Sequence, residues 1–189
     1  MMPEQDSTPP TYMSMTPEEK GLYPSIERSS AFLPQSSGAS IVLVEPQIPQ
    51  NTGNIMRLAA CTGAQLFLVG HLGFRLQDKG LRRSAMDYED VVTPVHHYEF
   101  QAVLDAHPPE TPVFYLSAKA EKSLWDVTFP PKALLVFGSE TKGLPASFVK
   151  NQQAHAIRIP MVEGVRSHNL SNSVAVVMYE FLRQCKKRV

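Results

Sequence analysis

Five short apolar runs, alternating with segments of helical spacing, constrain the fold of this 189-residue chain more than any other feature. Each run ends at a polar residue, a glycine or a proline. The runs are IVLVE (41–45), QLFLVG (65–70), PVFYLS (112–117), ALLVFG (133–138) and HAIRIP (155–160). Because their apolarity is continuous rather than alternating, they are typical of strands that are covered on both faces.

The segments between these runs predict helices. The first and the last helix each carry an apolar face, with residues at helical spacing. These faces hold Ile55, Leu58, Ala59 and Thr62 in the first helix, and Leu170, Val174, Val177 and Phe181 in the last. Two shorter helices are expected at 98–106 and 146–151. Strands that alternate with helices predict an α/β fold, with a mainly parallel sheet and helices on both of its faces.

The first 40 residues differ from the rest of the chain. They are rich in Pro and Ser and hold five acids against two bases, a net charge of −3. We predict a flexible N-terminal extension at 1–40, with one short helix beginning at 16–19, and a single folded domain at 41–189. The extension lacks the arginines of a transit peptide and the apolar segment of a signal peptide.

Composition and charge indicate the setting in which the chain works. No apolar stretch approaches the roughly 20 residues that span a bilayer, so we expect a soluble protein without a membrane partner. Cys61 and Cys185 fall within predicted helices and suit a reducing, cytoplasmic environment. The chain is neutral overall, so a polyanion would need a local cluster of cations such as Lys79, Arg82 and Arg83.

The first of three unusually polar loops is PQNTGNIMR (49–57). Asn51 or Thr52 is expected to cap a helix, which leaves Asn54 and Arg57 without a structural reason. Arg57 projects roughly 150° away from the apolar face of that helix. A cation in the first turns opposes the helix dipole, which suggests a phosphate or oxyanion partner. An arginine on a solvated face is the structural alternative.

The other two polar loops follow later strands. In VFGSETKGLP (136–145), glycines at positive φ account for a tight turn but not for Glu140, and the spacing excludes a P-loop. Near the C-terminus, six polar residues crowd the start of an apolar helix, where one cap suffices. They are Ser167, His168, Asn169, Ser171, Asn172 and Ser173. A polar pocket and an over-capped helix explain this crowd equally well.

Other candidates have weaker signals. His96-His97 favours a solvated strand end over a metal site, because adjacent strand residues face opposite ways. Ser167-His168 lacks the nucleophile elbow of a hydrolase. We expect Trp125 to be a packing residue.

The three polar loops, in this order, resemble the motifs of the SPOUT superfamily of RNA methyltransferases. NTGNIMR (51–57), VFGSETKGLP (136–145) and IPMVEGVRSHNLSNSVAV (159–176) match its first, second and third motifs. A fourth stretch, GFRLQDKGLRRSAMDYEDV (73–91), resembles the signature of the tRNA (cytidine(34)-2'-O)-methyltransferase branch, which acts on the wobble nucleotide. The resemblance covers residues 41–184 and leaves the N-terminal extension outside.

This resemblance implies a deep trefoil knot in the C-terminal half, a rare exception to unknotted topology, and a homodimer. It also implies that S-adenosylmethionine is held mainly by the backbone of three loops, without a metal. By position, the cofactor-binding residues are Leu116, Ser117, Gly138, Glu140, Ile159, Met161, Ser167 and Leu170. The loop after PVFYLS is not unusually polar, so only the resemblance indicates it as a cofactor-binding loop. His168 stands where the family usually has an apolar residue.

The implied reaction methylates a ribose 2'-hydroxyl in the anticodon loop of tRNA, with the oxygen about 3 to 3.5 Å from the methyl group. A guanidinium resists deprotonation, so we expect Arg57 to orient a phosphate and stabilise the developing oxyanion rather than act as the base. The predicted positioning residues are Asn51, Glu140, Ser167 and Asn169. The predicted RNA contacts are Arg57, Lys79, Arg82 and Arg83.

Three other functions fit parts of the sequence. The chain could methylate another tRNA position or ribosomal RNA, or it could be an inactive RNA-binding relative, although the matching Arg57 and Glu140 argue against inactivity. An unrelated flavodoxin-like nucleotide binder would not be stabilised by S-adenosylmethionine. For the methyltransferase, replacing Arg82 and Arg83 together by Ala is expected to weaken tRNA binding and flatten its salt dependence.

Overall fold

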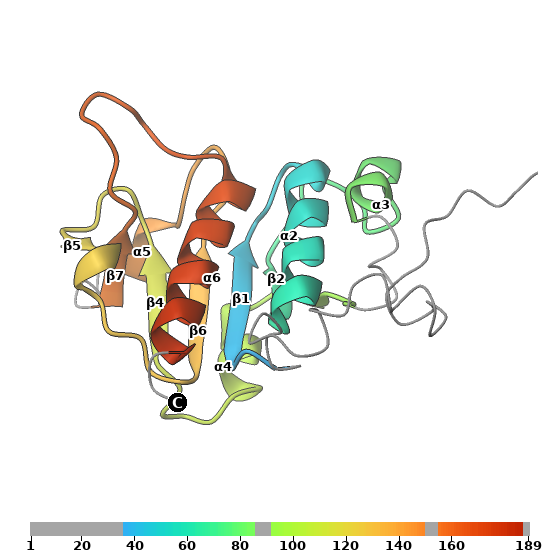
Figure 1. Ribbon diagram of the computed structural model, residues 1–189. Helices are drawn as coiled ribbons and strands as arrows, with labels where there is room; N and C mark the ends of the chain where they lie inside the picture. Colours follow the sequence, from blue (N-terminus) through green and yellow to red (C-terminus); the bar gives the residue numbers. More distant parts are fainter. Residues whose placement is uncertain (1–35, 86–91, 150–154, 187–189) are drawn as a thin grey trace, which may run out of the picture. The chain divides into compact units, whose positions relative to one another are not determined.

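One sheet of seven strands forms the centre of the computed structural model, which describes residues 36–85, 92–149 and 155–186 (Figure 1). Its spatial order is β3-β2-β1-β6-β4-β7-β5, and every neighbouring pair is parallel. The strands are β1 (Ala39–Val44), β2 (Gln65–Val69), β3 (Val95–His97), β4 (Val113–Leu116), β5 (Lys122–Ser123), β6 (Ala133–Phe137) and β7 (Ala156–Arg158). Each of the five apolar runs corresponds to one strand, with β1 beginning two residues before its run, and the predicted parallel sheet is confirmed.

Neither edge strand, β3 or β5, was among the five predicted strands, although His96-His97 was expected at a strand end, and β3 does end at His97 with both histidines half-buried. The two strands are three and two residues long, with the sequences VHH and KS. Each is defined by its pairing with one neighbour, β3 with β2 and β5 with β7. A strand that depends on a neighbour and buries little apolar surface leaves almost no pattern in the local sequence.

Helices flank the sheet. They are α2 (Pro49–Thr62), α3 (Lys79–Ala85), α4 (Phe100–Asp105), α5 (Ala146–Val149) and α6 (Leu170–Lys186), with a 3-10 turn η3 (Leu124–Asp126). The four predicted helices correspond to α2, α4, α5 and α6; the expected end of α5 at 150–151 falls outside the described residues. In the described part of the chain, no helix combines the length and the apolar character that crossing a membrane requires.

The sheet has a separate hydrophobic core on each face. Ile41 and Leu43 of β1 point to the face covered by α2 and α6, which lie side by side in Figure 1. Val42 and Val44, the alternate residues of the same strand, pack with Val103 of α4 on the other face. Both sets are buried, which is why the apolar runs are continuous. The prediction of helices on both faces is confirmed.

The start of α2 corrects one expectation. Ile48, not Asn51 or Thr52, is the N-cap residue, and its side chain makes no capping bond. Pro49 occupies the first helical position, where its missing N–H costs nothing. Because the helix begins earlier than expected, Asn51 and Thr52 lie inside its first turn, where both are buried.

The predicted face of α2 is otherwise confirmed. Ile55, Ala59 and Thr62 are buried and Leu58 is half-buried, whereas Arg57 is exposed. Cys61 on α2 is exposed and Cys185 on α6 is half-buried, and neither forms a disulfide. The predicted helix at 16–19 and nearly all of the N-terminal extension lie outside the described residues, and β1 begins at Ala39, just before the predicted domain boundary.

Candidate active site

The three polar loops meet at one edge of the sheet. Residues 45–48 follow β1, residues 138–145 follow β6, and residues 159–169 follow β7 and arch away before α6 begins (Figure 1). Because these strands are parallel, their carboxyl ends lie at the same edge, which is where ligands bind in such sheets. Loops that are far apart in sequence are therefore adjacent in space.

The carboxylate of Glu140 closes the N-terminus of α2 from a different loop. Its Oε2 accepts a hydrogen bond from the N–H of Gln47 (2.8 Å), and its Oε1 accepts one from the N–H of Ile48 (3.2 Å). The same Oε1 accepts a bond from Nδ2 of Asn51 (2.9 Å). A carboxylate is stabilised here by the positive end of the helix dipole. Glu140 thus supplies the cap that Ile48 cannot provide, which explains an acid in this turn.

Asn51 also bonds to the third loop, so it links that loop to Glu140. Its Nδ2 donates to Glu140, and its Oδ1 accepts a hydrogen bond from Nδ2 of Asn169 (2.9 Å). A carboxylate only accepts hydrogen bonds, so the orientation of the Asn51 amide is fixed, and that of Asn169 follows from it. The side chains of Glu140, Asn51 and Asn169 form a series with a single consistent polarity, which we call the amide relay.

Asn169 is also the cap of α6. Its Oδ1 accepts hydrogen bonds from the N–H of Ser171 (2.9 Å), from the N–H of Asn172 (3.3 Å) and from the Ser171 hydroxyl (2.7 Å). Ser173 bonds to the Asn169 carbonyl through its N–H and its hydroxyl. Some of the polar residues at the start of α6 therefore serve only to cap the helix. Asn169 serves both as a cap and as the end of the amide relay.

Two glycines shape the loop that carries Glu140. Gly143 has φ +68°, a conformation that glycine adopts without strain, as predicted. Gly138 does not have the positive φ that was also expected there. It is required for space, because a Cβ at this position would lie 2.0 Å from the carbonyl carbon of Gly143. The loop folds back so closely on its own backbone that no side chain fits.

The three predicted cofactor loops follow the adjacent strands β6, β4 and β7. The N–H of Ser117 donates to the carbonyl of Ile157 (3.0 Å), which ties the loop after β4 to β7. Leu116, Ile159 and Met161 are half-buried at this edge. Half-buried apolar side chains beside turn backbones fit S-adenosylmethionine, because they can cover an adenine while N–H and C=O groups bind its polar ends. The cofactor-binding roles of these individual residues stay a prediction.

Of the remaining predicted residues, Leu170 is buried in the core under α6, and the others whose side chains are described are exposed. Arg57 lies on α2, six residues and about 9 Å along the helix axis from Asn51. Ser167 and His168 are exposed in the arch before α6. On α3, the side chains of Lys79 and Arg83 are exposed, while the side chain of Arg82 lies outside the described part. The amide relay thus joins Asn51, Glu140 and Asn169, and Arg57 and Ser167 are presented to solvent on the elements that carry it.

Some features of the site were not expected from the sequence. Gly53 in the first motif has a packing role, since a Cβ there would lie 2.6 Å from Cβ of Ser84 and 2.7 Å from the Leu81 carbonyl of α3. Its spacing alone could not show which element crosses it. Trp125 was expected to be packed, but it is 77% exposed, because η3 buries Leu124 and turns the indole outward. That prediction was wrong.

Comparison with known proteins was consistent with this geometry. Residues 38–179 match the model of a family described as SpoU rRNA Methylase. The chain is 46% identical over 147 residues to the tRNA (cytidine(34)-2'-O)-methyltransferase of Polaromonas sp. (strain JS666), covering 77% of this chain and 90% of the relative. The enzyme of the same name from Escherichia coli (strain K12) is 45% identical over 146 residues, with 77% and 92% covered.

A solved structure gives the same result for the fold. It is described as structural insights into the 2-OH methylation of C/U34 on tRNA, and it superposes with a TM-score of 0.75 at 40% sequence identity. The superposition covers 79% of this chain and 97% of that one.

Proposed function

Because the chain belongs to the SpoU rRNA methylase family, as its motifs predicted, we propose that it methylates the ribose 2'-hydroxyl of nucleotide 34, a cytidine or modified uridine, in tRNA. The observation that carries this proposal is its identity of 46% across 90% of a relative named for that reaction. The family fold also implies the predicted trefoil knot in the C-terminal half.

S-adenosylmethionine supplies, when bound, a methyl group on a positively charged sulfur. Leu116, Ile159 and Met161 would line its site, and the backbones at Ser117 and Gly138 would bind its polar groups. The amide relay holds the loops after β1, β6 and β7 in register with one another, so the walls of that site are set before ligands bind. Asn51, Glu140 and Asn169 thereby act as positioning residues.

Arg57 is the residue that we place at the ribose. Its guanidinium carries five donors and retains its charge, so it can orient a phosphate and stabilise negative charge that develops on the 2'-oxygen. Its exposure on α2 leaves it accessible to a bulky polyanion. Ser167, exposed in the arch, would contact the cofactor or the substrate beside it. No metal is required for these steps.

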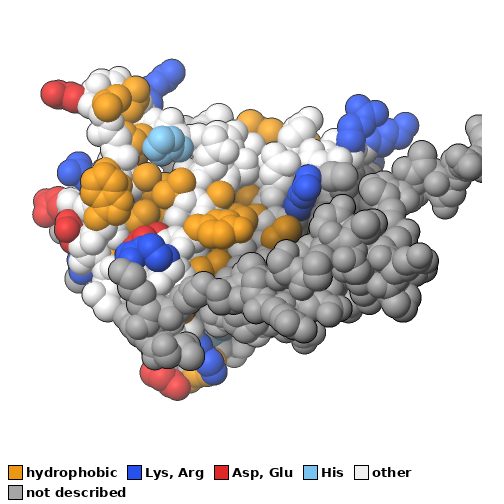
Figure 2. Space-filling model, viewed as in Figure 1, with side chains coloured by type: hydrophobic (Ala, Val, Ile, Leu, Met, Phe, Trp, Pro, Cys, Tyr) orange, Lys and Arg blue, Asp and Glu red, His pale blue; other side chains and the backbone are white. Residues whose placement is uncertain are grey.

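We also propose a homodimer formed through the face that α6 presents. Hydrophobic side chains gather on the face formed by α2 and α6 (Figure 2). Val176 and Tyr179 of α6 are 46% and 55% exposed, and Val162 and Val165 of the arch are exposed as well. A second copy would cover this apolar surface, which monomers rarely leave open. Light scattering tests the dimer, and Val176→Asp with Tyr179→Asp should yield monomers.

RNA contacts are proposed for Lys79, Arg82 and Arg83. Lys79 and Arg83 project from α3, which packs against α2 beside the amide relay. Two copies in a dimer would double this local charge on an otherwise neutral chain. A reducing cytoplasm also suits Cys61 and Cys185, which form no disulfide.

One experiment tests the activity and its position. The purified full chain is incubated with labelled S-adenosylmethionine and unmodified bulk tRNA, and the labelled nucleotide is mapped by nuclease digestion. Label at the 2'-oxygen of nucleotide 34 supports the proposal. Label at another position would change the substrate, and tRNA binding without label would identify an inactive RNA-binding relative.

A further inference from the structure

A cavity lies beside the proposed active site, between the loop after β2 and the residues after β3. Its volume is about 340 Å³, and it is shallow and open to solvent. The aromatic and charged side chains among those that line it are His71, Phe74, Arg75, His96 and Tyr98. The cofactor and catalytic residues proposed above do not include any of these side chains, although the cavity lies at the same carboxyl edge of the sheet.

Hydrogen bonds to backbone carbonyl groups hold the floor of this cavity in place. A ring nitrogen of His96, Nε2, donates to the carbonyl of Gly70 (2.9 Å), because a carbonyl can only accept. The N–H of Gly70 in turn donates to the carbonyl of His97 (2.9 Å). Gly70 has φ +80°, which lets the chain turn here. The two loops are therefore fixed to each other, and the rings they carry keep their places.

The walls of the cavity are aromatic rings, of which those of His71 and Tyr98 are exposed and that of His96 is half-buried. Tyr98 is 70% exposed, with its ring centroid 5.1 Å from that of His96 and 6.1 Å from that of His71. Tyrosine is enriched at binding surfaces because its ring is apolar and its hydroxyl is polar, and here one exposed tyrosine lies beside two histidine rings. A planar, unpaired nucleobase is the ligand that such rings bind by stacking.

The charge around the rings favours a nucleotide over an acidic or purely apolar ligand. Arg75 is exposed and lines the cavity together with His71, and the lining in the described part of the chain includes no Asp or Glu. A guanidinium can contact the phosphate of a stacked nucleotide or stack on its base.

The loop after β2, which lines the cavity, packs against the loop after β1 at the proposed active site. The N–H of Gly73 donates to the carbonyl of Pro46 (2.9 Å), and a Cβ at Gly73 would lie only 2.7 Å from Cα of Gln47. Gln47 is itself bonded to Glu140, the first member of the amide relay. A nucleotide in the cavity would therefore lie beside the loop whose N–H groups bond to Glu140 at the proposed active site.

From these contacts we infer that the cavity binds an unpaired nucleobase next to nucleotide 34, stacked on Tyr98, with Arg75 on its phosphate. This inference rests on the proposed function and extends it to a recognition site for the anticodon loop. Tyr98 acts in substrate binding, not at the reacting atoms.

The first test is Tyr98→Ala in the full chain. Loss of one stacked base should raise the KM for tRNA about tenfold, while kcat, the Kd for S-adenosylmethionine and the Tm stay unchanged. Tyr98→Phe keeps the ring and should keep the KM. Arg75→Ala should lower the salt dependence of tRNA binding, whereas Lys132→Ala, an exposed cation at the other edge of the sheet, should not.

The second test identifies the base. Anticodon hairpins with one abasic position at a time are titrated against the wild type and Tyr98→Ala. One abasic position should weaken wild-type binding about as much as Tyr98→Ala does, and should weaken that variant no further. If Tyr98→Ala binds every hairpin as the wild type does, the inference is wrong even when nucleotide 34 is methylated. If the wild type methylates no tRNA, the proposed function itself fails.

Discussion

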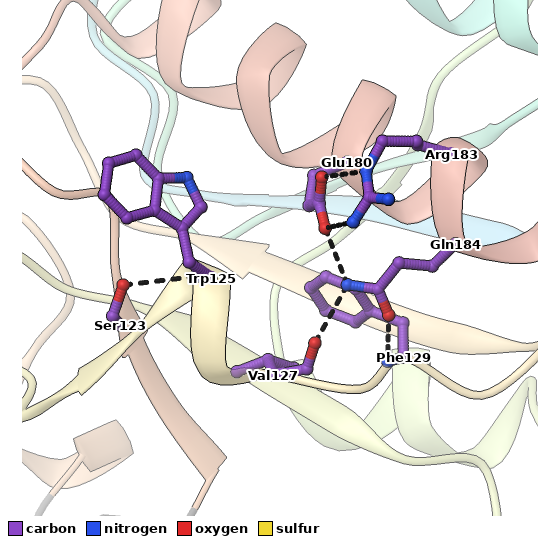
Figure 3. A network of polar contacts seen from close by, with 7 residues as sticks. All are labelled: Ser123, Trp125, Val127, Phe129, Glu180, Arg183 and Gln184. Carbon is purple, nitrogen blue, oxygen red and sulfur yellow. Dashed lines mark hydrogen bonds and ion pairs between the residues drawn. The ribbon is translucent and has the colours of Figure 1, made fainter.

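The parallel strands all begin at one side of the sheet, its amino edge, and all end at the opposite side, its carboxyl edge. These two sides are held together in different ways. At the carboxyl edge, Glu140, Asn51 and Asn169 bond side chain to side chain across three loops. At the amino edge, Gln184 of α6 bonds to the backbone of the segment before β6 (Figure 3). Its Oε1 accepts from the N–H of Phe129 (2.9 Å), and its Nε2 donates to the carbonyl of Val127 (2.8 Å).

This difference separates positioning from simple stability. Gln184 satisfies two backbone groups that would otherwise lose their partners, and similarly His107 links the Val103 carbonyl to the Ser40 hydroxyl. Such contacts stabilise the fold wherever they occur. The amide relay instead fixes the relative positions of loops whose other residues are exposed for ligands. Changes at the carboxyl edge should therefore alter catalysis, and changes at the amino edge should alter the free energy of unfolding.

The largest expected effect is that of Arg57→Ala. Removing the cation that stabilises the developing oxyanion should lower kcat by about 10²- to 10³-fold, with at most a small change in Tm because the side chain is exposed. Single-turnover methylation measures it, with Lys132→Ala as the control cation. A kcat within twofold of the wild type would remove Arg57 from the site.

Glu140→Gln should come next. The new NH₂ group would oppose the donors of Gln47, Ile48 or Asn51, which the carboxylate now satisfies together. Loss of a charge-assisted contact predicts about a 10- to 100-fold fall in kcat/KM, with a lower Tm. Glu110→Gln, an exposed acid before β4, is the matched control. A fall in Tm without a fall in kcat/KM would show that the relay is only structural.

Gln184→Leu tests the amino edge. It leaves the N–H of Phe129 and the carbonyl of Val127 without their present partner, so the free energy of unfolding should fall by about 1–3 kcal/mol. Denaturant melts measure this, and kcat at low temperature should not change. Gln101→Leu, which removes an exposed contact to Asp105, should cost far less. If Gln184→Leu lowered kcat as much as Glu140→Gln does, the amino and carboxyl edges would not differ in their effect on catalysis.

The smallest effect is expected at Thr52. Its hydroxyl is buried, and among the described residues it has no hydrogen-bond partner. Thr52→Val should therefore leave the Tm unchanged or raise it slightly, since no bond is lost. Thr62→Val is the opposite case, because the Thr62 hydroxyl donates to the Leu58 carbonyl (2.8 Å), and its Tm should fall. A marked loss of stability in Thr52→Val would reveal a partner for this hydroxyl.

The sequence by itself determined five of the seven strands of the parallel sheet and the family. Runs such as 41–45 and 133–138 bury both faces, so their apolarity is visible without any partner, and the motif residues Asn51, Glu140 and Asn169 stand in recognisable spacing. Local spacing also gave the buried face of α2. These features depend on neighbouring residues, which a linear pattern records.

Only the tertiary structure decided what those polar residues contact. The bonds of the amide relay join residues 89 and 118 positions apart, and no local signal specifies which loop caps α2. The short strands β3 and β5, and the outward turn of Trp125, likewise depend on neighbours. A hydrogen bond needs two atoms within about 3 Å, and only the folded parallel sheet brings the carboxyl ends of distant strands that close.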